Sequence, residues 1–137
     1  MMRSVVAVIA GYLVMAACVI ASTVLVATLM LGSAAMDGSV RPTPSYLIVN
    51  LAYSFVFALF GGYVAAFLAR RQPTVHAAAL AVVVLAIGLL SAREGGGSQP
   101  SWYPPLLTIG VPVFATFGGY LRALQLKMRA GVPAANR

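Results

Sequence analysis

Few side chains in this chain could take part in a reaction or hold a metal ion. Its 137 residues include one histidine, His76, one cysteine, Cys18, and two acidic residues, Asp37 and Glu94. Both acids fall in segments rich in glycine and polar residues, which we expect to be loops outside the membrane. Nucleophilic attack, proton transfer and metal binding each need several such groups close together, and the histidine and the cysteine lie on different predicted helices. The sequence therefore predicts no enzyme and no catalytic, cofactor-binding or metal site.

Two of these residues leave an alternative open. His76 lies near the start of a predicted helix, where a histidine commonly contacts water or lipid phosphate, but it could instead ligate a haem or pigment of an associated subunit. Arg3, followed by apolar residues and the segment 15–18 (MAAC), is similar to a bacterial lipoprotein signal in which Cys18 is lipidated. Because the chain stays apolar up to residue 31, the run 5–31 favours a retained membrane span.

Asn50 is the one carboxamide well inside an apolar run, with Ser54 one helical turn further on. A polar side chain at membrane depth is expected to face protein, not lipid. The residue therefore predicts a hydrogen bond between two membrane helices. The alternative is a polar contact with a bound ligand or ion, which makes Asn50 the candidate polar contact of this chain.

The composition indicates which elements must position these residues. The chain is 61% hydrophobic and 8% charged, with a mean hydropathy of +0.96, which is too apolar for a soluble domain of this size. Four stretches are long enough to cross roughly 30 Å of hydrocarbon. They are residues 5–31, 46–68, 75–92 and 105–121. We expect an all-α, integral membrane four-helix bundle that forms a single transmembrane domain over residues 1–137.

The basic residues predict an orientation for this bundle. The net charge of +7 does not indicate nucleic-acid binding, because the basic side chains lie at the ends of the spans and not along one polar face. Seven of them fall on one side of a four-span arrangement: Arg3, Arg70, Arg71, Arg122, Lys127, Arg129 and Arg137. Arg41 and Arg93 fall on the other side. This bias places both termini in the cytoplasm and predicts that anionic lipid headgroups contact the cytoplasmic face.

A repeat divides the chain into two halves. Residues 57–63 (FALFGGY) and 114–120 (FATFGGY) are nearly the same block at an offset of 57. The same offset relates Tyr46 to Tyr103 and Arg70 to Lys127. We therefore expect two helical hairpins that repeat in parallel, with the N and C termini on the same side.

Small residues recur four positions apart in and around both blocks, which lets helices approach closely. The predicted helix-packing residues are Ala58, Gly61, Gly62, Ala66, Ala115, Gly118, Gly119 and Ala123. A ligand site lined by the backbone at these positions is the alternative. Gly110 and Pro112 are expected to bend the fourth span, because proline lacks a backbone donor and crowds the preceding turn.

The segment 60–63 (FGGY), the residues Ala66, Ala69 and Arg70, then Pro73 and His76, and later the segment 102–103 (WY) form a recognisable series. In these features the chain resembles small four-span bacterial membrane proteins that are themselves uncharacterised. The resemblance implies the inner membrane of a bacterium and carries over no catalytic or binding residue. The fourth span departs from the internal repeat, since Arg122 stands where the repeat would place Ala65.

These observations favour a non-catalytic accessory subunit that packs against other integral membrane proteins or against copies of itself. Such a protein needs surfaces for helix association and no reactive groups. The alternative is a small facilitator or channel that acts as an oligomer, with a path beside Asn50 and the bend at Pro112.

Overall fold

The computed structural model describes residues 2–32, 40–69, 72–94 and 99–130. In these ranges it contains four α-helices: α1 (Met2–Leu31), α2 (Pro44–Leu68), α3 (Pro73–Glu94) and α4 (Tyr103–Ala130). Each is long and apolar enough to cross a membrane, over Val5–Leu31, Pro44–Leu68, Pro73–Ser91 and Tyr103–Ala130. The predicted all-helical class is confirmed, and the four apolar helices indicate a multi-pass membrane protein.

The helix ends differ from the predicted spans for local reasons. α2 and α3 each begin two residues earlier than the apolar run, at Pro44 and Pro73, because proline fits the first helical position, where no backbone donor is needed. The Thr43 side chain caps α2 by accepting a hydrogen bond from the Tyr46 amide at 3.3 Å. The C-terminal end of α4 also differs from the prediction. This helix continues beyond residue 121 to Ala130, since the polar residues of this segment are good helix formers.

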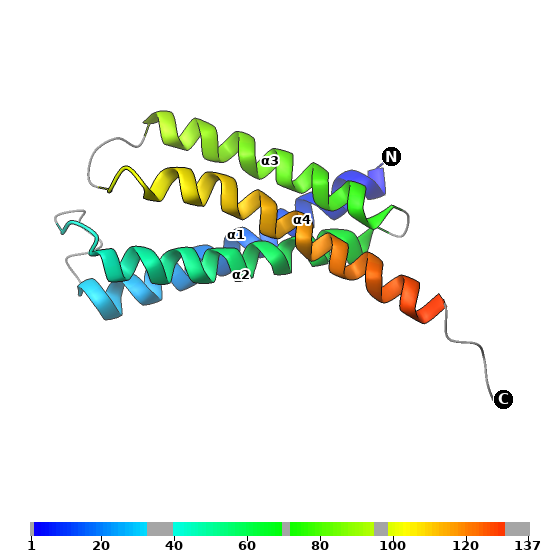
Figure 1. The fold of residues 1–137 in the computed structure, drawn as a ribbon, viewed down its shortest axis with the longest axis horizontal. Coiled ribbons are helices and arrows are strands. Elements are labelled where there is room, and N and C mark those ends of the chain that lie inside the picture. The colour runs from blue at the N-terminus through cyan, green and yellow to red at the C-terminus, as the bar shows by residue number, and fades with distance from the viewer. Residues whose placement is uncertain (1, 33–39, 70–71, 95–98, 131–137) are drawn as a thin grey trace.

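The helices run up and down, so that each end of the bundle has a distinct composition (Figure 1). At one end α1 begins, α2 ends, α3 begins and α4 ends; we call it the basic end, after Lys127 and Arg129 in the last turn of α4. At the opposite end α2 begins near Tyr46 and α4 begins at Tyr103, so we call it the tyrosine end. α1 therefore begins at the same end of the bundle at which α4 ends.

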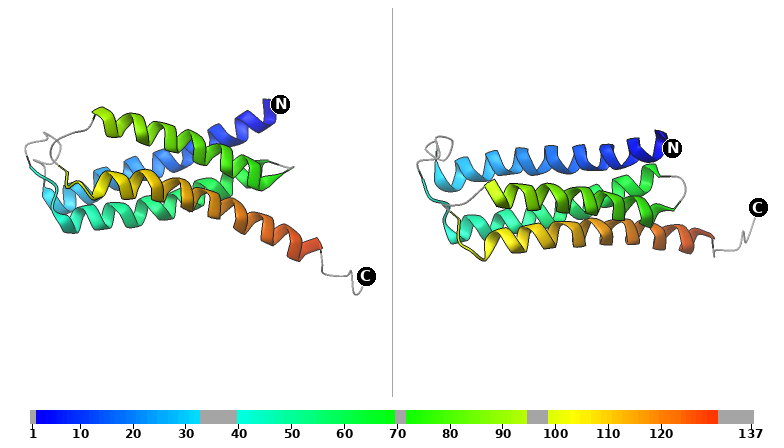
Figure 2. Two further views of the ribbon diagram at one scale, coloured as in Figure 1. Left: turned by 45° about the horizontal axis from the view of Figure 1, so that its top comes forward. Right: turned by 90° about the horizontal axis from the view of Figure 1, so that it is seen from above.

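α2 and α4 lie at the centre of the arrangement and form the most extensive helix pair. α1 packs on α2, α3 packs on α4, and within the described residues α1 has no contact with α4. α1 and α3 approach each other near the basic end and diverge towards the tyrosine end (Figures 1 and 2). The last turns of α4 project beyond the other helices at the basic end, after a bend in the middle of that helix.

The interior of the bundle is built mainly from small residues. Ala58, Ala65, Ala77 and Ala115 have no exposed surface, whereas many large apolar side chains point outward, up to 76% exposed for Leu29. A water-soluble domain has the opposite pattern. Close backbone packing inside and large apolar side chains outside is what helix association in lipid requires, because dispersion contacts replace the hydrophobic effect there.

Candidate functional site

Glycines bring the backbones of α2 and α4 into direct contact. A β-carbon on Gly62 would overlap the carbonyl oxygen of Ala115, and one on Gly118 would overlap the carbonyl oxygen of Leu59. Both clashes involve backbone atoms, which side-chain rotation does not relieve. The central helix pair therefore depends on the absence of side chains at these two positions.

The other two glycines of the repeated blocks serve the outer helices. Gly61 faces α1, where a β-carbon would lie 2.8 Å from the Met15 Cβ. Gly119 faces α3, where a β-carbon would overlap the Ala77 Cβ. All four glycines thus lie at contacts between helices of this chain, and so does Gly11, which the sequence analysis did not single out.

The two blocks match in sequence but not in their neighbours. At the offset of 57, Gly61 corresponds to Gly118, yet Gly61 faces α1 while Gly118 faces α2. Gly62, which faces α4, likewise corresponds to Gly119, which faces α3. On α2 the glycine that faces the outer helix precedes the one that faces α4, whereas on α4 it follows the one that faces α2. This reversed order places α1 and α3 on the same side of the α2–α4 pair, consistent with the contact between α1 and α3.

Most of the predicted packing residues therefore lie in the interior of the bundle, between helices of this chain. Seven of the eight are buried: Ala58, Gly61, Gly62, Ala66, Ala115, Gly118 and Gly119. Ala123 is half-buried. These positions hold the protein's own helices together, so contacts with a partner must use other residues.

Asn50 lies at the centre of a polar network near the tyrosine end. The Tyr103 hydroxyl of α4 donates to Asn50 Oδ1 at 2.6 Å, and Asn50 Nδ2 donates to the Tyr53 hydroxyl. The Tyr53 hydroxyl in turn lies 2.8 Å from Thr23 Oγ1 of α1. The structure thus places Asn50 in a hydrogen bond between helices, in line with the sequence expectation, and the network connects α1, α2 and α4.

The same residue lines a cavity of about 480 Å³ among the four helices. Its walls are mostly apolar, and its polar lining comes from Tyr12, Asn50, Ser54, Ser91 and Thr108. The remaining lining residues are Met15, Ala16, Val19, Ile20, Val84, Ile87, Gly88, Leu107 and Val111. Asn50 is 8% exposed and Ser54 is 3% exposed, so both polar side chains are buried in the bundle. Both sequence interpretations of Asn50, a bond between helices and a ligand contact, therefore fit its position.

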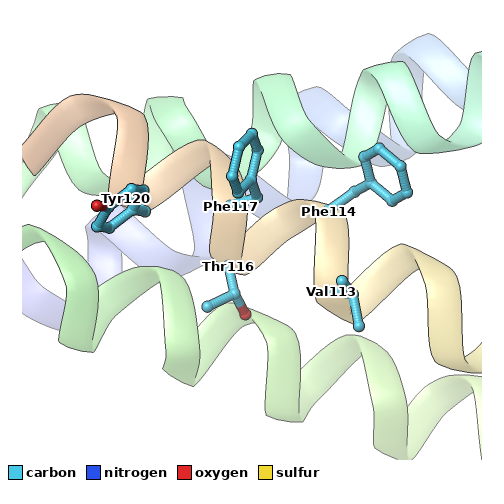
Figure 3. A pocket seen from close by; sticks show the side chains of 5 residues that line it. All are labelled: Val113, Phe114, Thr116, Phe117 and Tyr120. Atoms are coloured by element: carbon cyan, nitrogen blue, oxygen red, sulfur yellow. The ribbon is translucent and has the colours of Figure 1, made fainter. Parts of the chain in front are cut away.

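A second hollow, of about 650 Å³, lies on the outer face of α4 (Figure 3). It is lined by Val113, Phe114, Thr116, Phe117 and Tyr120, which all belong to this one helix. Val113, Phe117 and Tyr120 are each at least half exposed. The Phe114 ring stacks on Phe55 of α2, with 4.8 Å between the ring centroids, which fixes one edge of the hollow.

At the basic end, polar groups attach α4 to α2. The Tyr63 hydroxyl donates to Gln125 Oε1 at 2.8 Å. The Arg122 guanidinium lies over the Phe67 ring, 4.7 Å from its centroid, and within 3.4 Å of the same glutamine oxygen. Arg122 stands where the repeat would place Ala65, and the structure places its guanidinium against α2.

His76 and Cys18, the residues considered for cofactor or lipid attachment, each lie within a regular helix. His76 Nδ1 lies 3.0 Å from the carbonyl oxygen of Gln72 at the start of α3. α1 continues as a helix past Cys18 to Leu31, and the thiol is half-buried. Among the side chains that the structure describes, no three His, Cys, Asp or Glu residues are grouped as metal ligands. Asp37 lies outside the described residues.

Several residues of the site were not found from the sequence. Gly11 belongs to no repeated block, and Tyr53 and Thr23 are common residues in membrane helices. The repeat pairs Tyr103 with Tyr46 and so draws attention to Tyr103, but it does not indicate that Tyr103 forms a hydrogen bond with Asn50. Comparisons of the chain with known protein families, with curated protein sequences and with solved structures found no match.

Proposed function

We propose that this chain is a non-catalytic accessory subunit of the bacterial inner membrane, with both termini in the cytoplasm, and that it packs against other integral membrane proteins. The excess of Lys and Arg at the basic end supports the orientation, since cytoplasmic segments carry more positive charge. The position of the α1 start and the α4 end at the same end of the bundle fits an even number of crossings (Figure 1).

The observation that carries this proposal is the uncovered outer face of α4. Gly118 and Gly119 turn two faces of this helix, about 100° apart, towards α2 and α3, and Phe117 and Tyr120 point away from the bundle. Together with Val113 they line the hollow shown in Figure 3. α4 thus has two faces that contact helices of this chain and a third face that carries the hollow.

A helix of another protein fits this face for a physical reason. Helices associate in lipid through close van der Waals contact, in which the side-chain ridge of one helix enters a groove of the other. Aromatic rings provide large, rigid contact areas, because few rotatable bonds are fixed on binding. The last turns of α4 extend this surface, because Met128 lies about three helical turns after Phe117 on the same face and is exposed.

Affinity purification from native membranes in mild detergent tests this role. The Phe117→Ala/Tyr120→Ala double variant should lose a co-purifying membrane protein, or a second copy of this chain, that the unaltered protein retains. Phe60→Ala is the matched control, since Phe60 corresponds to Phe117 in the repeat and is equally exposed, at 50% against 51%, but lies outside the hollow. Equal recovery of the partner with both variants, or monomer alone from the unaltered protein, would contradict the proposal.

A facilitator or channel is the second candidate. The cavity favours it, because Asn50 and Val111, next to the helix-bending Pro112, line the same space. Towards the basic end the path is closed by the glycine contacts at Gly61 and Gly62, so transport requires these helices to separate. Solute flux into proteoliposomes that contain only the purified protein would support this candidate.

A further inference from the structure

The cavity among the four helices has the features of a binding site that is separate from the outer face of α4. Its volume of about 480 Å³ falls within the roughly 300 to 1,000 Å³ of typical small-molecule sites. The described residues that line it include no charged side chain. A charged ligand would lose its hydration there without gaining a counter-charge, so the occupant must be uncharged.

One N–H donor in this cavity has no acceptor among the described residues. The Asn50 amide group has two N–H donors, and one of them binds the Tyr53 hydroxyl. Its oxygen accepts from Tyr103 and, at the limit of 3.5 Å, from Ser54. No second acceptor for the amide nitrogen is found among the described residues, although Asn50 is 92% buried. A buried donor without an acceptor is unfavourable, so an oxygen atom of a ligand would stabilise this site.

Pro112 leaves the backbone carbonyl of one lining residue without its usual helical donor. Pro112 lies inside α4 and has no N–H to donate to the carbonyl oxygen of Thr108, one turn earlier. Thr108 lines the cavity together with Ser54 and Asn50. The polar part of the lining therefore offers both a donor and acceptors, which matches a hydroxyl or carbonyl head in an otherwise apolar space.

The cavity reaches the lipid-facing surface between α1 and α3. Ile20 of α1 and Ile87 of α3 line it and are 63% and 40% exposed. These helices diverge on the side of the tyrosine end (Figure 1). A chain attached to the head could leave through this opening into the bilayer, where apolar material is the surrounding solvent.

We propose that this cavity binds an uncharged membrane lipid, with an oxygen-bearing head beside Asn50 and an apolar chain that leaves between α1 and α3. Glycerol lipids with one acyl chain and isoprenoid quinones both carry this chemistry. The binding does not depend on the accessory role, because no residue that lines the cavity also lines the hollow on α4.

Binding to the purified full-length protein tests the proposal, with monoolein as the glycerol-lipid probe and a decyl-tailed benzoquinone as the quinone probe. Hexadecane is the probe without oxygen. At least one oxygen-bearing probe should bind to saturation and hexadecane should not, and the preferred probe identifies the source. Equal binding of hexadecane, or no saturable binding of either oxygen-bearing probe, would overturn the proposal.

Two variants locate the binding in the cavity. Ala16→Phe should abolish it by filling the space, whereas Ala17→Phe should not, since Ala17 is the exposed neighbour outside the lining. Asn50→Leu should weaken binding about threefold to tenfold through the loss of one hydrogen bond. Binding that survives Ala16→Phe would refute the assignment even if Asn50→Leu does not fold.

Discussion

Gly11 and Gly61 lie against each other where α1 crosses α2. A β-carbon on Gly11 would lie 2.8 Å from the Gly61 carbonyl oxygen, and one on Gly61 would lie 2.9 Å from the Gly11 carbonyl oxygen. The contact is reciprocal, so each backbone occupies the space that a side chain on the other would need. α1 has no contact with α4 in the described residues, so this crossing and the contact with α3 attach it to the bundle.

Replacing Gly11 by leucine should therefore loosen α1. Overpacking at a close helix contact costs about 1 to 3 kcal/mol, which lowers the thermal unfolding midpoint of the detergent-solubilised protein. Ala17→Leu on the exposed face of the same helix should leave the midpoint unchanged. Equal midpoints for the two variants would show that the crossing is not a packing determinant.

The central pair should be sensitive to a single methyl group. Gly62→Ala places a β-carbon against the Ala115 backbone and should destabilise the protein, because α2 and α4 must separate to admit it. Gly88→Ala is the matched control, since its β-carbon would lie 3.3 Å from the Thr108 Cγ2, a side-chain atom that can shift. Unfolding curves in detergent measure both, and a Gly62→Ala protein as stable as the unaltered one would contradict the structure.

Tyr103→Phe tests the bond that joins α4 to α2 at the tyrosine end. Loss of the hydroxyl removes the 2.6 Å hydrogen bond to Asn50 Oδ1 and should lower stability by about 0.6 to 2 kcal/mol. Tyr120→Phe removes a hydroxyl from a half-exposed side chain on the lipid-facing side of α4 and should have little effect. If both variants unfold at the same temperature, the Asn50 network makes no measurable contribution.

The basic end should bind anionic lipid through Lys127 and Arg129, which are exposed in the last turn of α4. Phosphatidylglycerol should raise the thermal stability of the protein in detergent, and the effect should weaken as salt is increased. The Lys127→Ala/Arg129→Ala variant should show a smaller effect. A stabilisation that is independent of salt, or equal with phosphatidylcholine, would argue against an electrostatic contact.

Much of the fold follows from simple properties of the sequence. The number and type of the helices follow from four apolar runs of membrane length, and the small residues predict close packing. The extent of α4 does not follow from these runs. In its last turns, up to Ala130, the polar residues Arg122, Gln125, Lys127 and Arg129 interrupt the apolar pattern, so the span predicted from the sequence ends at residue 121.

The choice of neighbour for each glycine is set by tertiary structure. Gly61 and Gly62 are adjacent, so their faces differ by about 100° around the helix, and either one could have faced α1. The repeat predicts equal roles for Gly61 and Gly118, but the position of α1 and α3 on one side of the central pair exchanges those roles. Neighbours from distant segments, such as Tyr103 for Asn50, leave no local pattern to read.

A photoreactive benzoylphenylalanine at position 117, introduced in cells, tests the accessory role most directly. Irradiation of native membranes should link this position to another membrane polypeptide, or to a second copy of the chain, because Phe117 lines the hollow on the outer face of α4. The same probe at position 60 should give only lipid adducts. Lipid adducts alone at position 117, or the same polypeptide linked from both positions, would contradict the account.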